Sequence, residues 1–388
     1  MRICFWSTSF QADNQALASY LSVQAGVQVL VALDDPGRYR QEPVIRLLPF
    51  GGTLLDRQAP ATLDAILEFA PDCLVVDNHL PKRRLAQRLY VLWHGYGWRV
   101  DDLSSMKREL RKLVGDVAQP NPDFRWQAFG DRDRAYRIEH SGFAPENVLA
   151  LGSAYSDLLL PGAPLAPRLD LESLGDHYRI DLQRPTVLLG MTWHHGGALA
   201  HWGDDAELHQ RLAEHVGALG ANLLIRMHDR HRYARAEVQR MEALASQYPH
   251  VQLKFKNSHP DSLVDLLLSS VLISNYSSLL NAFYYTGKPS IHIDPIVHEG
   301  PNYRRDLRWG TLRTKKLEDP LESWKLSPDD IGGLRVGSFS ELLAAVSQGL
   351  SDPSCCSATA QAFIERHITL ADGGSCERIS NLLRHWLA

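Results

Sequence analysis

The segment LISNYSSLLNAFYYTGKP, residues 272–289, places two adjacent hydroxyls at the end of an apolar run. A strand that ends there must turn, and Ser277 and Ser278 are then expected to open a helix. Free N–H groups and the positive dipole end favour anions at a helix N-terminus, and hydroxyls add further donors. The segment therefore predicts a diphosphate site, although a plain N-cap is the simpler interpretation of either serine taken singly.

Two histidines follow other apolar runs. His94 in LWHGYGW is followed by Gly95, which lets another molecule approach, and a neutral imidazole accepts a proton near pH 7. His228 ends LLIRMH, and Arg226 shares its side of an extended strand because side chains alternate with a period of two. His94 is therefore a candidate general base, and Arg226 and His228 are candidate polar groups of a site at the end of a strand. The structural alternatives are a histidine that holds a turn and an arginine in a partly buried salt bridge.

Metal and dinucleotide chemistry are disfavoured by the motifs. Two groups of histidines could in principle bind zinc: His194, His195 and His201, and His228 with His231. Neither group has the helical H-E-x-x-H motif or nearby cysteines that zinc sites commonly use. The sequence has no G-x-G-x-x-G after its first apolar run and no G-x-x-x-x-G-K-[ST]. We expect no metal and no other cofactor, and activity without added divalent ion, because no carboxylate pair is placed to hold Mg²⁺ against phosphates.

Strands and helices must position these groups. Short runs rich in Val, Ile and Leu alternate with helical segments, which is the pattern of parallel strands covered on both faces. Strands are predicted at 2–7, 27–33, 73–78, 88–94, 125–130 and 147–152, and again at 185–193, 222–228, 251–256, 271–275 and 289–294. The candidates above fall after strand ends, where open α/β sheets bind ligands. Helix caps are predicted at Asp261 and, as a capping box, at Ser338 with Glu341.

Composition bounds the class of protein. A chain of 388 residues with 44% hydrophobic and 22% charged residues favours two globular domains, and the proline-containing stretch 160–185 is the candidate linker. With a net charge of −4 the protein as a whole has no positive electrostatic field that would attract a nucleic acid. Five cysteines without a CxxC pair fit a reducing cytosol, and we expect neither a signal peptide nor a membrane span. Basic clusters at 81–88, 106–113 and 303–316 are compatible with peripheral membrane contact.

The same stretches resemble those of one known family. Six stretches of the chain occur in the order found in the CDP-glycerol glycerophosphotransferases of teichoic acid and capsule synthesis. They are LWHGYG (92–97), VLALGSAYSDLLL (148–160), VLLGMTW (187–193), LLIRMH (223–228), VLISNYSSLLNAFYYTGKP (271–289) and LADGGSCERISNLL (370–383). The resemblance implies an α/β GT-B fold of two Rossmann-like domains facing each other across a cleft. It implies an acceptor domain at 1–165, a nucleotide-donor domain at 180–365 and a helix at 366–388 that crosses back.

The resemblance also implies site residues. His94 is the expected catalytic base, His228 a second active-site histidine at the donor phosphates, and Ser277 and Ser278 the diphosphate ligands. The further donor-site candidates are Arg226, Asn275 and Tyr276, and the other cleft candidates are Gly95, Gly152, His194, Asp372, Gly373 and Ser375.

The sequence departs from the family at Asn275 and Asn281, where the family has Asp, and at His194, where Arg is typical. We expect a transferase that moves a glycerophosphate or glycosyl unit, CDP-glycerol being the first candidate donor, to a hydroxyl of a cell-surface glycan or lipid-linked acceptor. It would act in the cytoplasm, at the inner face of the plasma membrane. The alternatives are a glycosyltransferase using a CMP- or UDP-sugar, a nucleotide-sugar 2-epimerase and an inactive nucleotide-binding module.

Overall fold

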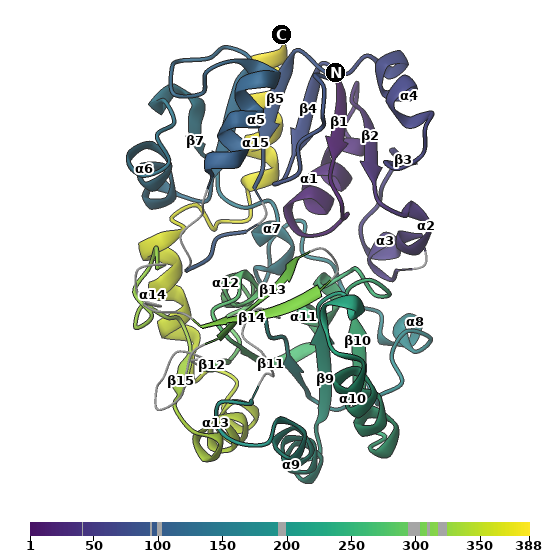
Figure 1. The fold of residues 1–388 in the computed structure, drawn as a ribbon, viewed down its shortest axis with the longest axis vertical. Coiled ribbons are helices and arrows are strands. Elements are labelled where there is room, and N and C mark those ends of the chain that lie inside the picture. Colours follow the sequence, from purple (N-terminus) through teal and green to yellow (C-terminus); the bar gives the residue numbers. More distant parts are fainter. Residues whose placement is uncertain are drawn as a thin grey trace.

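Two parallel β-sheets divide the chain into an N-terminal and a C-terminal domain, which lie one above the other in Figure 1. The computed structural model describes residues 1–40, 42–93, 95–98, 103–192, 199–293, 303–308, 311–316 and 324–388. The stretch 160–185 runs from the first sheet to the second and holds the short helix α8 (Leu171–Leu174).

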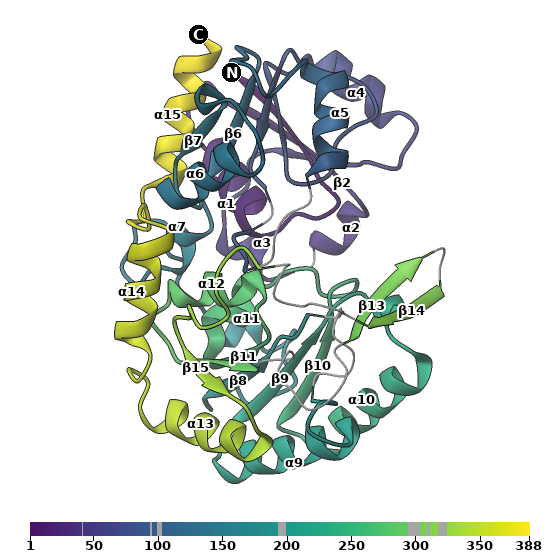
Figure 2. The ribbon, with the colours of Figure 1, turned by 60° about the vertical axis from the view of Figure 1, so that its left-hand side comes forward.

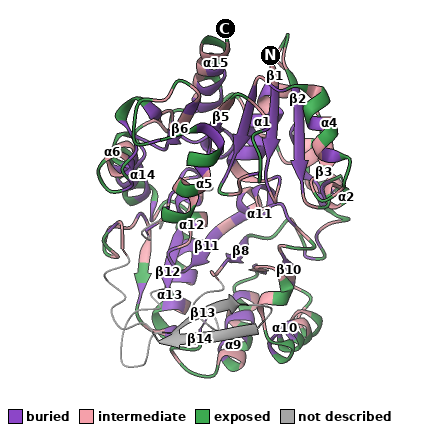
Figure 3. Ribbon diagram, turned by 45° about the horizontal axis from the view of Figure 1, so that its top comes forward, coloured by how far each residue is buried: buried purple, intermediate pink, exposed green. Residues whose placement is uncertain are grey.

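The N-terminal sheet has seven strands in the order β3-β2-β1-β4-β5-β6-β7, all parallel. Its strands are β1 (Arg2–Trp6), β2 (Gln28–Leu33), β3 (Thr53–Asp56), β4 (Cys73–Val76), β5 (Arg88–Val91), β6 (Phe124–Ala128) and β7 (Val148–Ala150). Its helices are α1 (Ala12–Ser22), α2 (Pro36–Tyr39), α3 (Val44–Leu47), α4 (Thr62–Phe69), α5 (Ser104–Val114), α6 (Asp131–Glu139) and α7 (Ser156–Leu159). Every residue of β4 is buried, and so are all but the first residue of β1 and of β2, which Figure 3 colours purple. This is expected where helices cover both faces of a sheet.

The C-terminal sheet has six parallel strands in the order β10-β9-β8-β11-β12-β15. They are β8 (Thr186–Leu189), β9 (Asn222–Met227), β10 (Val251–Phe255), β11 (Ser269–Ser274), β12 (Ser290–Ile293) and β15 (Leu334–Val336). Its helices are α9 (Asp205–Ala218), α10 (Arg235–Gln247), α11 (Leu263–Leu268), α12 (Ser278–Tyr284) and α13 (Phe339–Ser351). An antiparallel hairpin, β13 (Tyr303–Arg308) and β14 (Thr311–Lys316), projects from this domain in Figure 2.

The predicted helix caps are present. Asp261 accepts hydrogen bonds from two backbone N–H groups at the start of α11. The Ser338 hydroxyl accepts from the backbone N–H of Glu341 at 3.2 Å. The Glu341 carboxylate accepts in return from Gly337, one residue before the serine, at 2.8 Å. Side-chain acceptors thus satisfy N–H groups that have no partner within the helix.

The last two helices return to the N-terminal domain. In Figure 2, α13, α14 (Ser357–His367) and α15 (Ser375–Leu387) follow one side of the molecule from the C-terminal domain upward. α15 packs against α1 and α7 of the N-terminal domain. Two facing parallel-sheet domains and this crossing helix confirm the predicted GT-B fold.

Candidate functional site

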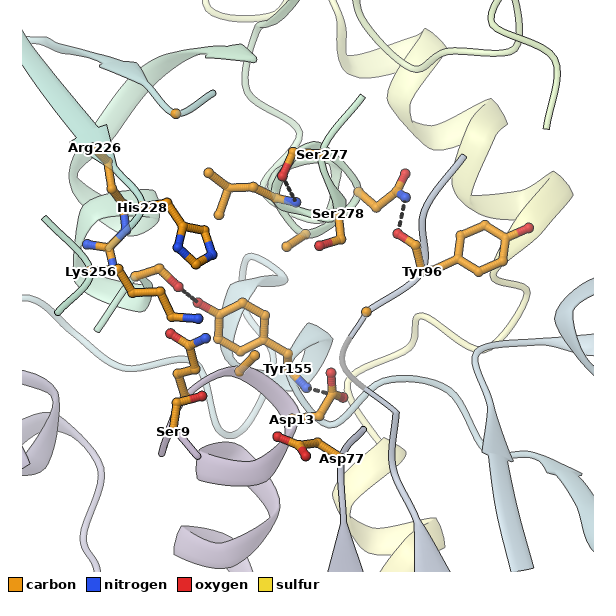
Figure 4. Close-up of a pocket in the computed structure, with 18 of the residues that line it drawn as sticks. Ser9, Asp13, Asp77, Tyr96, Tyr155, Arg226, His228, Lys256, Ser277 and Ser278 are labelled. Atoms are coloured by element: carbon orange, nitrogen blue, oxygen red, sulfur yellow. Dashed lines mark hydrogen bonds between the residues drawn. The ribbon is translucent and has the colours of Figure 1, made fainter. Parts of the chain in front are cut away.

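A cleft of about 570 Å³ lies between the two domains (Figure 4). The described residues that line it follow β1, β4, β5, β6 and β7 of the first sheet and β8, β9, β10 and β11 of the second. These are the carboxyl ends of parallel strands, where α/β sheets bind ligands. The fold therefore brings polar residues from distant parts of the sequence to one opening.

The turn after β5 meets α12 across the domain boundary. His94 and His194, two residues predicted for the site, lie outside the described residues. Gly95, which follows His94, lines the cleft with φ of +131°. A Cβ atom at Gly95 would lie 2.9 Å from Cβ and 3.1 Å from Oγ of Ser278. The close approach and the positive φ both require glycine here.

The two serines have different roles. Ser277 is the N-cap of α12, and its Oγ accepts a hydrogen bond from the backbone N–H of Leu279 at 3.3 Å. Ser278 is the first residue of the helix and is exposed. Both line the cleft (Figure 4). The plain N-cap interpretation thus describes Ser277, whereas the hydroxyl of Ser278 is presented to the cleft.

His228 lies in the cleft directly after β9, as predicted. Its Nδ1 lies 2.8 Å from the carboxylate and 2.8 Å from the backbone nitrogen of Asp229, and its own backbone N–H donates to the hydroxyl of Tyr233 at 2.9 Å. Burial lowers the pKa of His228, against the opposing effect of Asp229. Asp229 thus orients a ring that is neutral near pH 7.

Lys256 is a further cation in the lining of the cleft, and it was not predicted from the sequence. It follows β10 and lines the cleft close to His228 in Figure 4. Among the described residues its ammonium has no hydrogen-bond or ion-pair partner, and burial lowers its pKa. An anion in the cleft would supply the missing counter-charge. The available signal was its position at the end of a predicted strand.

Arg226 is held in a salt bridge at the border of the cleft. Its Nη1 lies 2.5 Å from the buried carboxylate of Asp265. Its Nη2 donates to the carbonyls of His259 at 3.0 Å and Pro260 at 3.2 Å. The salt-bridge alternative therefore describes this arginine in the structure, and its contact with a phosphate stays a prediction.

Asn275 and Tyr276 are also not donor-site residues, because both are buried and neither lines the cleft. Asn275 accepts a hydrogen bond from the backbone N–H of Thr192 at 2.7 Å, which joins the ends of β11 and β8. Tyr276 has φ of +51°, and its hydroxyl donates to the carbonyl of Pro328 at 2.8 Å. Its ring packs edge-on against Trp98. The two residues shape the turn that presents the serines.

The remaining cleft candidates lie elsewhere: Gly152, Asp372, Gly373 and Ser375. The carboxylate of Asp157 accepts from the backbone N–H groups of Ser375 at 3.1 Å and Cys376 at 2.7 Å, at the start of α15. A Cβ atom at Gly152 would collide with the Ser375 hydroxyl. Arg378 pairs with Asp372 at 2.7 Å. These residues attach α15 to the N-terminal domain, so their assignment to the cleft is wrong.

The N-terminal wall of the cleft contains two carboxylates that were not predicted. Asp13 accepts from the hydroxyl of Ser153 at 2.7 Å and from the backbone N–H of Tyr155 at 3.2 Å, and burial raises its pKa to about 6. Asp77 lies on the same wall beside His79, with 3.0 Å between Oδ1 and the ring Nδ1. Both acids belong to segments without a motif, so only the fold reveals them.

Among the described residues, no group of three or more His, Cys, Asp or Glu side chains is arranged to hold a metal ion. In the same part of the chain no helix is long and apolar enough to cross a membrane.

No family model and no curated protein sequence matches the chain. Solved structures do match it. The wall teichoic acid polymerase TagF superposes over 100% of this chain and 88% of its own, with a TM-score of 0.69 and 13% identity. The UDP-GlcNAc 2-epimerase from Neisseria meningitidis bound to UDP-GlcNAc covers 99% of this chain and 100% of its own, with a TM-score of 0.56 and 15% identity. The S. aureus MnaA complex with UDP covers 100% of this chain and 97% of its own, with a TM-score of 0.54 and 13% identity. At these identities the likeness establishes the fold.

Proposed function

We propose that this protein is a GT-B transferase. A nucleoside diphosphate donor binds to the C-terminal wall of the cleft, and a hydroxyl acceptor binds to the N-terminal wall. The observation that carries the proposal is the convergence of Lys256, His228 and Ser278, which follow three strands of one sheet and line one cleft. An ammonium that has no counter-ion in the described part of the chain, beside a neutral imidazole and an exposed hydroxyl, matches the needs of a diphosphate.

The C-terminal wall stabilises the leaving group in this proposal. Lys256 neutralises charge on the diphosphate, while Ser278 and His228 supply polar contacts. Negative charge grows on the bridging oxygen as its bond to the transferred unit breaks. Groups already in place for that charge often contribute more to catalysis than any other effect. A hydrogen bond to a charged group contributes about 1.5–3 kcal/mol.

His94 is the proposed base. The support is the motif together with Gly95, whose contact with Ser278 brings the turn after β5 to the donor wall. The acceptor hydroxyl gives its proton to the imidazole while its oxygen forms the new bond, and the nucleotide leaves with the electron pair of the broken bond. His94→Asn is expected to lower kcat by about 10²- to 10⁴-fold and to leave nucleotide binding intact.

CDP-glycerol is the first donor to test, because the resemblance in sequence and the TagF fold point the same way. Attack would then fall on phosphorus, whereas with a CMP- or UDP-sugar it would fall on the anomeric carbon. A 2-epimerase is the second candidate function, favoured by the carboxylates of Asp13 and Asp77 in the cleft and by the epimerase folds. Conversion of UDP-GlcNAc without any acceptor would identify it.

A thermal-shift screen with CDP, UDP, GDP and CMP tests the proposal. A ligand at 100 times its Kd stabilises the folded state by about 2.7 kcal/mol. We expect a cytidine or uridine diphosphate to raise Tm of the wild type and of Lys82→Met, an exposed lysine that does not line the cleft. Lys256→Met is expected to lose most of this response. No response to any nucleotide, or an equal response of Lys256→Met, would contradict the proposal.

Independence from metal is part of the proposal. Transfer should continue in EDTA, since Lys256 supplies the positive charge at the diphosphate. Inactivation by a chelator and recovery with Mg²⁺ would show that a cation shares this role. A glycan or lipid-linked acceptor and a cytoplasmic location at the membrane face stay predictions from the sequence.

A further inference from the structure

The two walls of the cleft differ in charge. On the C-terminal wall, Arg226 pairs with Asp265 and Arg232 pairs with Asp229. Among the described residues the ammonium of Lys256, on the same wall, has no ion-pair partner. Among the described residues of the N-terminal wall there are two carboxylates and no lysine or arginine. The rest of that wall is mainly hydroxyl and amide groups. A phosphate is therefore attracted to one wall and repelled by the other, although both face the same space.

A buried aspartate and a histidine form the chemical centre of the N-terminal wall. Oδ2 of Asp77 accepts from the hydroxyl of Ser7 at 2.5 Å and from the amide of Asn14 at 3.4 Å. Oδ1 accepts from the backbone N–H of His79 at 2.8 Å. Burial alone would raise the pKa of Asp77, but its hydrogen bonds with His79 and Ser7 lower it. The carboxylate is thus ionised and can only accept hydrogen bonds.

This environment fixes the tautomer of His79. Its Nδ1 lies 3.0 Å from Oδ1 of Asp77, so Nδ1 must carry the proton and donate it to the carboxylate. In that tautomer Nε2 is the acceptor nitrogen of the ring. The side chain is 41% exposed and lines the cleft, and in the described part of the chain Nε2 has no partner. The wall therefore presents an oriented acceptor that suits a hydroxyl donor.

We propose that the Asp77–His79 pair is the acceptor-recognition element of the cleft, and that it selects an uncharged polyol or sugar whose hydroxyl donates to Nε2 of His79. This rests on the proposed function only in calling the bound molecule an acceptor. A phosphate or carboxylate next to that hydroxyl would lie against Asp77 and Asp13 without a counter-ion from the described wall. A neutral glycan end is accommodated, and a chain that ends in a phosphodiester is disfavoured.

The first test reads His79 directly by two-bond ¹H–¹⁵N spectra of the full chain labelled with ¹⁵N-histidine. The signal of His79 is assigned by its loss in His79→Gln. We expect an Nδ1–H tautomer that methyl β-D-glucopyranoside, at tens of millimolar, perturbs. Glycerol 3-phosphate at the same concentration should leave it unchanged. His385, exposed on α15, serves as the control signal for both probes.

An Nε2–H tautomer, no response to the neutral sugar, or an equal response to glycerol 3-phosphate would overturn the proposal. Asp77→Asn is expected to remove the tautomer preference, and an unchanged preference would count against the pair. Nucleotide binding is measured separately by thermal shift. A nucleotide response with an unresponsive His79 overturns the acceptor site alone, whereas a responsive His79 without nucleotide binding overturns the proposed function alone.

Kinetics provide the second test once transfer is measured with CDP-glycerol or a UDP-sugar. Loss of one hydrogen bond of about 0.5–1.5 kcal/mol corresponds to about 2- to 12-fold. His79→Gln should raise KM for a neutral acceptor by that factor and leave KM for the donor unchanged. A change in the donor KM, or none in either, would show that His79 does not recognise the acceptor.

Discussion

Replacing Arg226 separates a structural role from a catalytic one. Its guanidinium binds Asp265, which is completely buried and also accepts from Lys254 at 2.9 Å and from the hydroxyl of Tyr178 at 2.5 Å. In Arg226→Met the carboxylate keeps two of these three partners, and two backbone carbonyls lose their donor. The side chain is only 8% exposed, so solvent cannot replace what is lost.

The size of the effect follows from this geometry. Removing one partner of a buried ion pair costs about 3–5 kcal/mol, because the other charge is left uncompensated. Lys254 still compensates Asp265, so we expect the lower end, about 3 kcal/mol. A domain of 150–250 residues loses about 2–4 °C in Tm per kcal/mol. The C-terminal domain of Arg226→Met should therefore melt about 6–12 °C lower.

Calorimetric melting and nucleotide titration below the transition give the two readouts. We expect the Tm to fall as stated and the nucleotide affinity of the folded variant to stay within about 3-fold of wild type. Asp265→Asn, which removes the same pair from outside the cleft, should destabilise the domain comparably, and the double variant should be less than additive. An unchanged Tm with affinity lowered 10-fold or more would show that Arg226 binds phosphate after all.

Three further outcomes are expected. Gly95→Ala, which forces a side chain against Ser278, should lower kcat by about 10²-fold, because misplacement of about 1 Å is enough. It should also lower Tm, because alanine is strained at a φ of +131°; full activity would refute the close approach. Asp157→Ala should lower the free energy of urea unfolding by about 2 kcal/mol through the loss of acceptors at α15, while the nucleotide response stays; equal stability would contradict this. The pKa of Asp13, raised by burial to about 6, implies a stabilisation that is complete below pH 3.8 and lost as the pH rises through about 6. The difference in unfolding free energy between wild type and Asp13→Asn should therefore change between pH 3.8 and about 6. A difference that stays constant over this range would argue against the raised pKa of Asp13.

Most of the fold could be predicted from apolar runs, because buried parallel strands need continuous hydrophobic residues. All eleven predicted strands have a counterpart among β1, β2, β4–β12. β3, β13, β14 and β15 were missed. β3 and β15 are short edge strands, and most of their residues are at least partly exposed. Their pairing depends on a neighbouring strand that is distant in sequence, so a local pattern carries little signal for them.

The site could be predicted only where a strand end coincides with a distinctive residue. Ser278 and His228 were found in this way. The salt bridge of Arg226 had no local signal because its partner, Asp265, lies 39 residues further along the chain, and only the fold brings the two together. Tyr276 was misassigned because a positive φ turns it away from the cleft. Lys256 was overlooked because a single lysine after a strand has no pattern to distinguish it.

The central claim is that Lys256 provides the charge that holds a diphosphate on the C-terminal wall. The most direct test of this claim is calorimetric titration. Wild type and Lys256→Met are each titrated with the tightest-binding nucleoside diphosphate and with the corresponding monophosphate. We predict that the variant binds the diphosphate about 10- to 100-fold more weakly and loses its preference for diphosphate over monophosphate. Equal affinities of the two proteins for the diphosphate would contradict the claim.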